Sequence, residues 1–287
     1  MSGNPRFLVV DGYTKKARDE LAVGGATVAG PLYAAMLNEV AGGAVCDIVY
    51  PSDPGAMLPK GKALDDFDGV AWTGCSLTIF EDIPEVRAQV DFARAAYAAG
   101  VPGFGSCWGA QIAAVAAGGT VAANPKGREM GIARKIALTP EGRAHPLYRG
   151  KAPVFDGFIS HYDEVTQLPP GGVNLAGNAF TRVQALAVTS GKGTFWGLQY
   201  HPEYDLHEMA RLVWCRIDRL VKDGFFENRA AGENYVALME TLHANPRRKD
   251  LAWLLGVDAD VMDKAIRQIE VVNWIEHLVR PTMAKRR

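Results

Sequence analysis

The chain has 287 residues, of which 48% are hydrophobic and 22% are charged, and its formal net charge is −1. This length supports a substantial core, in one large domain or in one domain with an appendage. A charge so close to zero gives no electrostatic argument for nucleic acid or a membrane surface as partner. No stretch approaches the roughly 18 apolar residues of a spanning helix, and the first apolar run is too short for a signal segment, so we expect a cytoplasmic protein.

In chain order, short apolar strands alternate with helices through the first part of the sequence. Strands are predicted at 7–10, 45–50, 69–72 and 101–104, and helices at 31–40, 84–99 and 111–117. Strands that are apolar throughout, rather than alternating, predict a parallel, doubly wound α/β sheet with both faces covered. In such a sheet the active site lies at the carboxyl ends of the strands.

The pattern changes from residue 132 to 188, where β-rich segments alternate with Gly/Pro turns. This change predicts an antiparallel extension of the sheet. A last apolar strand follows at 195–200.

From residue 228 onward the sequence predicts helices alone, at 233–243, 248–255 and 258–278. The last of these carries an apolar stripe at helical spacing, formed by Val261, Ala265, Ile269, Val272, Ile275, Leu278 and Val279. The stripe either packs back onto the preceding domain or forms an interface, and we favour self-packing or a homodimer over a heterologous partner. We therefore divide the chain into a domain 1–227 and a C-terminal helical extension 228–287.

The segment Gly105-Ser106-Cys107-Trp108-Gly109 has the form of a nucleophile elbow, a sharp strand-to-helix turn. Its glycines remove the Cβ atoms that would clash in so tight a bend. Cys107 would then stand at a helix N-terminus, where backbone N–H groups and the helix dipole favour the thiolate. The alternative is a buried structural cysteine in a tight turn.

His201 and Glu203 follow the last predicted strand and supply what a nucleophilic cysteine needs. In an extended chain residues i and i+2 point to the same side, so the two side chains can meet. The imidazole can serve as the base for Cys107, and the carboxylate can hold the imidazole in the right tautomer. Alternatively, His201 is an ordinary strand-end histidine and Glu203 favours the N-terminus of the next helix.

Other motifs give little support to metal or nucleotide binding. The histidines lack a metal-ligand spacing such as HExxH, so we expect no metal. The glycines at 103, 105 and 109 form a loose dinucleotide pattern, but residues 120–124 offer no acid about 20 residues on, so no cofactor is expected. The four cysteines show no CxxC spacing, which predicts free thiols in a reducing compartment.

These blocks together resemble the class I glutamine amidotransferases, whose signature joins a G-x-C-x-G-x-Q elbow to a later H-P-E. Here the two blocks are residues 105–111 and 201–203. The resemblance covers about residues 6–222, extends to blocks at 127–132 and 160–165, and is nearest to the glutaminase domain of GMP synthetase. It implies a flavodoxin-like amidotransferase fold.

The resemblance implies hydrolysis of the side-chain amide of glutamine, with ammonia released for an acceptor. Cys107 would attack the amide carbon, His201 would pass a proton to the departing ammonia, and Glu203 would orient the imidazole. The oxyanion would be held by the backbone N–H of Trp108 and by that of Gly74 or Cys75, where the family often has Gly-Gly-Pro.

The same resemblance places the amino-acid end of glutamine at Gln111 and at the main chain of Ser160, His161 and Tyr162. For Gln111 the alternative is a polar residue on the exposed side of the elbow helix. For His161 a structural role in its loop is an equal alternative.

Two enzymatic functions and one non-enzymatic function are compatible with these features. The first is a glutamine-hydrolysing subunit whose ammonia serves a separate synthetase, because the sequence shows no synthetase domain and no ATP-binding glycine loop. The second is an independent hydrolase of γ-glutamyl amides or peptides. The third is a non-catalytic regulatory protein on this fold, which the intact set of Cys107, His201 and Glu203 disfavours.

Overall fold

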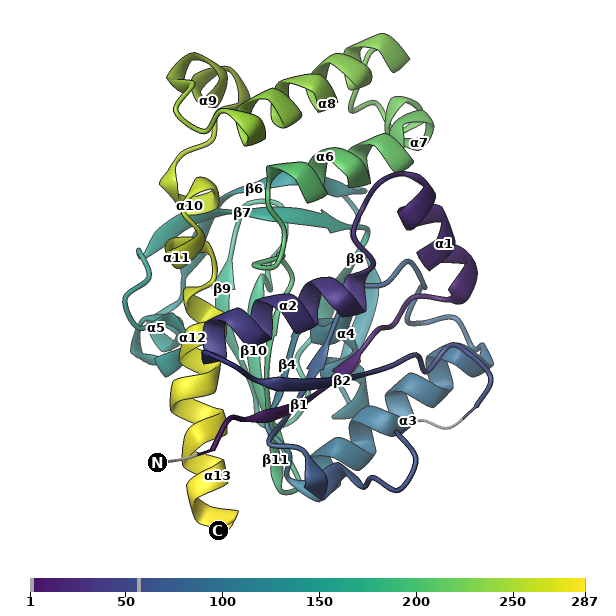
Figure 1. The fold of residues 1–287 in the computed structure, drawn as a ribbon, viewed down its shortest axis with the longest axis vertical. Helices are drawn as coiled ribbons and strands as arrows, with labels where there is room; N and C mark the ends of the chain where they lie inside the picture. Colours follow the sequence, from purple (N-terminus) through teal and green to yellow (C-terminus); the bar gives the residue numbers. More distant parts are fainter. Residues whose placement is uncertain (1–2, 56–57, 287) are drawn as a thin grey trace.

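The computed structural model describes residues 3–55 and 58–286, and a sheet of nine strands lies at its centre (Figure 1). The strand order is β2-β1-β3-β4-β11-β10-β9-β6-β7. The parallel strands are β1 (Arg6–Val10), β2 (Val45–Val49), β3 (Gly69–Trp72), β4 (Gly103–Ser106) and β11 (Gly193–Leu198). The antiparallel strands are β6 (Glu129–Leu138), β7 (Val154–His161), β9 (Gly172–Gly177) and β10 (Ala185–Ser190). The predicted parallel sheet with an antiparallel extension is confirmed.

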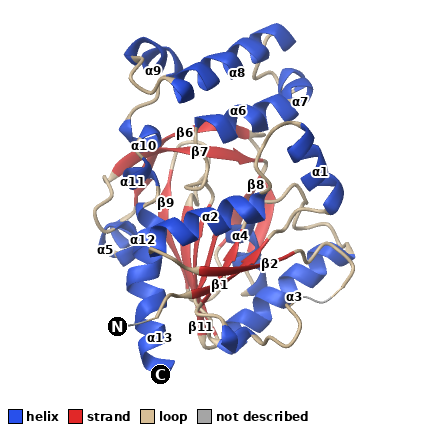
Figure 2. Cartoon of the chain, in the orientation of Figure 1, coloured by secondary structure: helices blue, strands red, loops and turns tan. Residues whose placement is uncertain are grey.

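Helices cover both faces of the parallel strands (Figure 2). Successive residues of a strand point to opposite faces, so Phe7 and Val9 of β1 join one core cluster while Leu8 and Val10 join another. The first face packs against α2 (Ala29–Ala41), and the second against α3 (Pro84–Ala99) and α4 (Trp108–Ala116). Burial on both faces is why these strands read as unbroken apolar runs.

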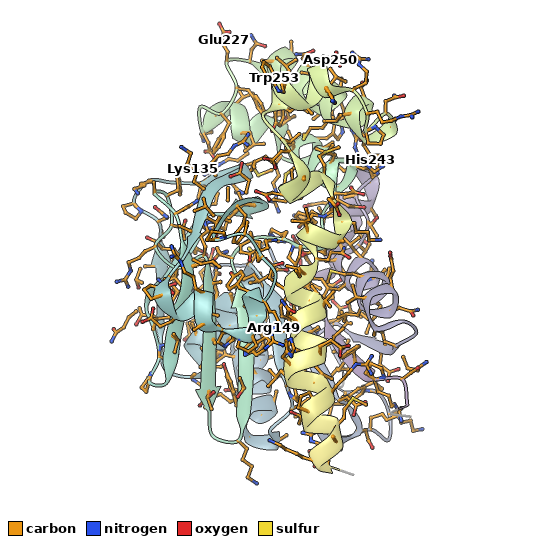
Figure 3. All side chains as sticks on the ribbon, turned by 90° about the vertical axis from the view of Figure 1, so that its left-hand side faces the viewer. Lys135, Arg149, Glu227, His243, Asp250 and Trp253 are labelled. Atoms are coloured by element: carbon orange, nitrogen blue, oxygen red, sulfur yellow. The ribbon has the colours of Figure 1, made fainter. Side chains whose placement is uncertain are left out.

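The end of the chain supplies a second helical cover on the face of α2. It consists of α12 (Ile269–Trp274), the π-helical turn η3 (Ile275–Val279) and α13 (Arg280–Arg286), which run down one side of the molecule (Figures 1 and 3). Trp274 is fully buried, with its ring centroid 5.3 Å from that of Phe7 and 5.4 Å from that of Phe104. Large aromatic side chains of this kind bury much apolar area. The C-terminal segment therefore belongs to the main core.

A separate helical layer lies over β6 and β7. It contains α6 (Leu206–Cys215), α7 (Ile217–Lys222), α8 (Arg229–Ala244) and α9 (Lys249–Leu255), and α1 (Lys15–Val23) packs beside α6. Most apolar residues of this layer face inward, but Trp253 of α9 is 89% exposed at the outer edge (Figure 3). The smaller elements are β5 (Thr120–Ala123) paired with β8 (Asp163–Gln167), α5 (Pro140–Ala144), η1 (Leu64–Asp66) and η2 (Pro146–Tyr148).

The single helix predicted at 258–278 is wrong. The chain forms α10 (Ala259–Met262) and α11 (Lys264–Arg267) before α12 begins. Asp258 and Asp263 each accept backbone N–H groups at the start of one of these short helices, because an aspartate side chain competes for such donors and caps a new helix. Of the predicted stripe, Val261, Ile275 and Val279 are buried.

The division at residue 228 stays a prediction. Asn228 is the N-cap of α8, and its side chain accepts the N–H of Ala231. Beyond it, α8 packs on α6 while α12 and α13 join the sheet core. In the described part of the chain no helix combines the length and apolar character that crossing a membrane requires.

Candidate active site

A pocket of about 420 Å³ opens where β3, β4 and β11 end. This is the edge of the sheet at which a doubly wound fold places its ligand. Eight of the predicted site residues line it: Gly74, Cys75, Cys107, Gln111, Ser160, His161, Tyr162 and His201. The Trp108 side chain and Glu203 lie outside the lining.

Cys107 occupies a strained turn between β4 and α4. Its φ of 52° and ψ of −102° are unusual for a residue other than glycine. The turn is packed tightly against β3, since a Cβ on Gly105 would come within 2.9 Å of the Trp72 carbonyl oxygen. The thiol lies 3.6 Å from the carbonyl oxygen of Ser160, on the opposite wall of the pocket. The elbow geometry thus presents the cysteine sulfur to the pocket.

His201 and Glu203 form a buried pair beside this turn. The distance from His201 Nδ1 to Glu203 Oε1 is 2.7 Å. The His201 ring stacks on the Tyr204 ring, with 4.2 Å between the ring centroids. Gly74 lies close to both His201 and Cys107, since a Cβ placed on it would be 3.0 Å from His201 Cε1 and 3.8 Å from the Cβ of Cys107. Within residues 3–55 and 58–286, His201 Nε2 has no hydrogen-bond partner. The structure therefore brings Cys107, His201 and Glu203 together and leaves Nε2 as the ring nitrogen available to the thiol.

The charge state of His201 follows from these neighbours. Burial opposes the protonated ring, but the negative charges of Glu203 and Cys107 more than offset it and raise the pKa of His201 to about 9. At neutral pH the His201 ring is then an imidazolium.

Two residues that were not predicted from the sequence, Ser106 and Tyr33, form a chain of hydrogen bonds that ends on Glu203. Ser106 Oγ lies 3.0 Å from Oε1 and 3.1 Å from Oε2 of Glu203, and Tyr33 Oη lies 2.5 Å from Ser106 Oγ. Ser106 donates its hydroxyl hydrogen to Glu203, so its oxygen accepts the hydrogen bond from the Tyr33 hydroxyl. Both side chains are fully buried. Ser106 could have been noticed inside the elbow motif, whereas nothing in the sequence connects Tyr33 to it.

Of the residues predicted to supply oxyanion donors, Trp108 follows Cys107 in the chain, and Gly74 and Cys75 line the same pocket as Cys107. Trp108 is the first residue of α4, where a backbone N–H has no partner within the helix, and its side chain turns away to donate to Gln89 at 2.8 Å. Gly74 and Cys75 both line the pocket, and the Cys75 thiol donates to the Gly12 carbonyl at 3.0 Å. The N–H groups of Gly74 and Cys75 stay alternative predictions for the second donor.

Gln111 is only 4% exposed, which excludes the exposed alternative. Its Nε2 donates to the Asp163 carbonyl at 2.9 Å and to Gln199 at 3.3 Å. These bonds tie the elbow helix to the segment that follows Tyr162.

His161 is engaged by the protein through both ring nitrogens. Nδ1 lies 2.9 Å from the Asp163 carbonyl oxygen and Nε2 lies 3.1 Å from Glu129 Oε2. Glu129 is also held by side chains of Asn178, Thr181 and Gln184 at 2.7–2.9 Å. Burial opposes the ionised carboxylate, but the hydrogen bonds from His161, Asn178 and Thr181 lower the pKa of Glu129. His161 thus fixes the shape of the wall that carries Ser160.

An arginine cluster borders the pocket beside Ser160. Its members are Arg128, Arg216 and Arg219. Arg216 Nη1 donates to Ser160 Oγ at 2.5 Å and Arg128 Nη1 donates to it at 3.3 Å. The Arg128 guanidinium stacks over the Tyr162 ring at 3.8 Å. Arg128 stands in a block already noted in the sequence, but Arg216 gave no signal because it lies at the break between α6 and α7.

In the part of the chain that the structure describes, no three His, Cys, Asp or Glu side chains are grouped so that they could hold a metal ion.

Comparison with known proteins identifies the family. The family model described as Glutamine amidotransferase class-I matches residues 80–213. A γ-glutamyl-L-1-hydroxyisopropylamide hydrolase of Pseudomonas sp. is 34% identical over 289 residues, which cover 98% of this chain and 95% of the relative. The chain belongs to the class I glutamine amidotransferases.

Other class I amidotransferases match a smaller part of the chain. A glutamine-hydrolysing GMP synthase subunit of Ignicoccus hospitalis is 32% identical over 157 residues, which cover 55% of this chain and 78% of the relative. The resemblance inferred from the two sequence blocks is confirmed, and the protein is an enzyme of this family.

Two solved structures show the same fold as this amidotransferase. A glutamine amidotransferase from Thermotoga maritima superimposes with a TM-score of 0.64 at 16% identity, covering 97% of this chain and 99% of that one. A glutamine amido transferase from Methylobacillus flagellatus has a TM-score of 0.60 at 21% identity, with 99% and 95% covered. Both extend over the C-terminal helices, so these helices are part of a shared architecture.

Proposed function

We propose that this amidotransferase hydrolyses γ-glutamyl amides through Cys107, His201 and Glu203, with glutamine as the simplest substrate of this kind. The observation that carries the proposal is the buried His201–Glu203 pair: His201 Nε2 has no hydrogen-bond partner among the described residues, and His201 and Cys107 line the same pocket. A cysteine, a base and a carboxylate that orients the base are the parts of a nucleophilic amide hydrolase.

The reaction proceeds in two steps. The Cys107 thiolate attacks the γ-carbonyl carbon, and the N–H of Trp108 with that of Gly74 or Cys75 stabilises the oxyanion. The His201 imidazolium gives its Nε2 proton to the leaving nitrogen, so the C–N bond breaks, the amine departs and a γ-glutamyl thioester remains. Neutral His201 then takes a proton from water, whose oxygen attacks the thioester and releases glutamate and the thiol.

The wall from Ser160 to Tyr162 holds the glutamyl group in this account. Gln111 and His161 act on it indirectly, because their polar atoms bond to the protein and fix the loop at Asp163. The Tyr162 ring stacks against the Arg128 guanidinium. We infer that main-chain groups of this wall contact the substrate.

An independent γ-glutamyl amide hydrolase is favoured over a component of a synthetase. The Pseudomonas hydrolase matches nearly the whole chain, including the C-terminal helices, whereas the Ignicoccus GMP synthase subunit matches about half of it. The second candidate function, release of ammonia from glutamine for a separate synthetase, rests on the Ignicoccus relative. A homodimer through the C-terminal helices also stays a prediction, and the exposed Trp253 and Leu254 are the apolar residues there that could serve it.

The test is amine release by the purified enzyme from glutamine and from γ-glutamyl alkylamides. We expect turnover of the alkylamides with no second protein present. Cys107→Ala should lower the rate by at least about a thousandfold while the fold is retained. If glutamine is the only compound hydrolysed, and if its hydrolysis requires the addition of a partner protein, the synthetase function is favoured. A fully active Cys107→Ala enzyme would refute the nucleophile.

A further inference from the structure

We propose that Arg128 and Arg216 bind the α-carboxylate of the γ-glutamyl group, so that the pocket selects substrates in which this carboxylate is free. The inference rests on the proposed function and names the part of the substrate that the triad does not touch. It excludes glutamine residues within a peptide chain, whose α-carboxylate has become an amide.

The first support is an imbalance of charge. Three guanidinium groups border this side of the pocket, those of Arg128, Arg216 and Arg219, and of these Arg128 and Arg219 share the carboxylate of Asp223. Asp223 is already engaged, because it accepts from Arg219 Nε at 2.9 Å and from the Tyr162 hydroxyl. Among the described residues no carboxylate lies within ion-pair distance of Arg216. A buried or half-buried cation needs an anionic partner, and the substrate can supply it.

The second support is an unused donor. Arg128 Nε is buried and makes no hydrogen bond to any described residue, and the nearest acidic oxygen, Oδ2 of Asp223, is 3.8 Å away. The guanidinium is nevertheless fixed in place by stacking on Tyr162. A rigid guanidinium with spare donors suits bidentate recognition of a planar carboxylate.

The third support is the position of the pair relative to the nucleophile. The carbonyl oxygen of Ser160 lies 3.6 Å from the Cys107 thiol, and the hydroxyl of the same residue is where both arginines converge. One residue thus spans the distance from the reacting sulfur to the cations, as the short carbon chain of a glutamyl group must do. Asp163 and Glu81 also line the pocket and offer negative charge to the α-ammonium group.

The experiment compares two substrates that differ only at the α-carbon: γ-glutamyl ethylamide and the same compound with its α-carboxylate converted to a carboxamide. Arg216→Gln should lower kcat/KM for the free acid by about 10- to 100-fold, mainly through KM, because a charge-assisted bond is lost. The carboxamide should change by less than about threefold. Arg128→Gln should behave likewise, and Lys222→Gln, which removes an exposed charge from α7 outside the pocket lining, is the control.

Equal losses on both substrates, or none on either, would overturn the inference. A binding measurement separates it from the proposed function: calorimetric titration of L-glutamine and its α-carboxamide into Cys107→Ala, with and without Arg216→Gln. If the wild type hydrolyses no γ-glutamyl amide but the binding preference for the free acid depends on Arg216, the proposed function fails and the inference stands. A preference that is absent or independent of Arg216 refutes the inference.

Discussion

Single side chains at the active site act mainly through hydrogen bonds that leave them one possible orientation. Glu203 illustrates this, because its carboxylate accepts one hydrogen bond from His201 Nδ1 and another from Ser106 Oγ. Tyr33 in turn holds Ser106, and its pKa lies well above the usual range, because of burial first and the charge of Glu203 second. Tyr33 therefore stays a neutral donor, and the chain of hydrogen bonds ends on the Glu203 carboxylate.

Removing this support should slow catalysis without weakening substrate binding. We expect Ser106→Ala to lower kcat by about tenfold to a hundredfold, less than the ~10⁴-fold loss that follows when a triad carboxylate loses its charge. Tyr33→Phe keeps the ring in the core and should give a smaller loss. The measurement is steady-state kcat and KM of both variants on a γ-glutamyl amide. A change confined to KM would contradict the proposal that Ser106 and Tyr33 position Glu203.

The raised pKa of His201 also makes a prediction about stability. Its pKa rises from 6.5 to about 9 on folding, so the protonated ring stabilises the fold fully below pH 6.5 and this contribution disappears as the pH rises through 9. The loss should amount to about 3 kcal/mol, since one pKa unit is worth about 1.4 kcal/mol. Urea unfolding at pH 6 and pH 10 measures it, with His201→Gln as the control that lacks the titrating group. Identical pH dependence in the two proteins would contradict the assignment.

At the scale of the elements, the elbow depends on how closely α4 approaches β3. A Cβ on Gly109 would come within 2.9 Å of the Trp72 Cβ and 3.0 Å of its carbonyl oxygen. The backbone of β3 cannot move away easily, because Trp72 is fully buried and its strand pairs on both sides. The elbow is therefore fixed by packing as well as by its own dihedral angles.

Gly109→Ala should accordingly damage both stability and activity. We expect a loss of about 1–3 kcal/mol from overpacking, together with a lower kcat because the turn at Cys107 shifts. Gly42→Ala is the comparison, because Gly42 caps α2 with a φ of 70° and has nothing within 4 Å of its missing Cβ. It should cost about 1–2 kcal/mol from the backbone alone and leave kcat unchanged. Thermal unfolding and initial rates report the two effects separately.

The sequence predicted the elements whose signals are local. The apolar runs of the parallel strands and the glycines around Cys107 needed no knowledge of the rest of the chain. Tyr33 and Arg216 could not be predicted as site residues, because each meets its partner only when distant elements pack together. The apolar stripe does not reveal the break at Asp263, because the break depends on a capping side chain that accepts backbone N–H groups.

At the scale of the whole molecule, the C-terminal helices are divided between two environments. Trp274 lies inside the sheet core against Phe7, Phe104 and Gly69. Trp253 stands on α9 at the surface (Figure 3). Both are large apolar side chains in the C-terminal helices, and only the path of the chain distinguishes their environments.

These two residues provide a matched pair of substitutions. Trp274→Ala should destabilise the protein by about 3–5 kcal/mol, because it leaves a large cavity beneath the sheet. Trp253→Ala should change the free energy of unfolding by less than about 0.5 kcal/mol. Denaturant unfolding measures both, and a small effect at Trp274 would show that the C-terminal helices are not needed for the core. Size-exclusion chromatography of Trp253→Ala tests the predicted homodimer at the same time.

The central claim is that Cys107 carries the γ-glutamyl group as a thioester during turnover. It is tested most directly by quenching the enzyme in acid during steady-state hydrolysis of a γ-glutamyl amide and mapping the adduct by peptide mass spectrometry. We predict a γ-glutamyl adduct on the peptide that contains Cys107, absent without substrate and absent in Cys107→Ala. Continued turnover with no adduct on that peptide, or an adduct on Cys75 in its place, would contradict the account.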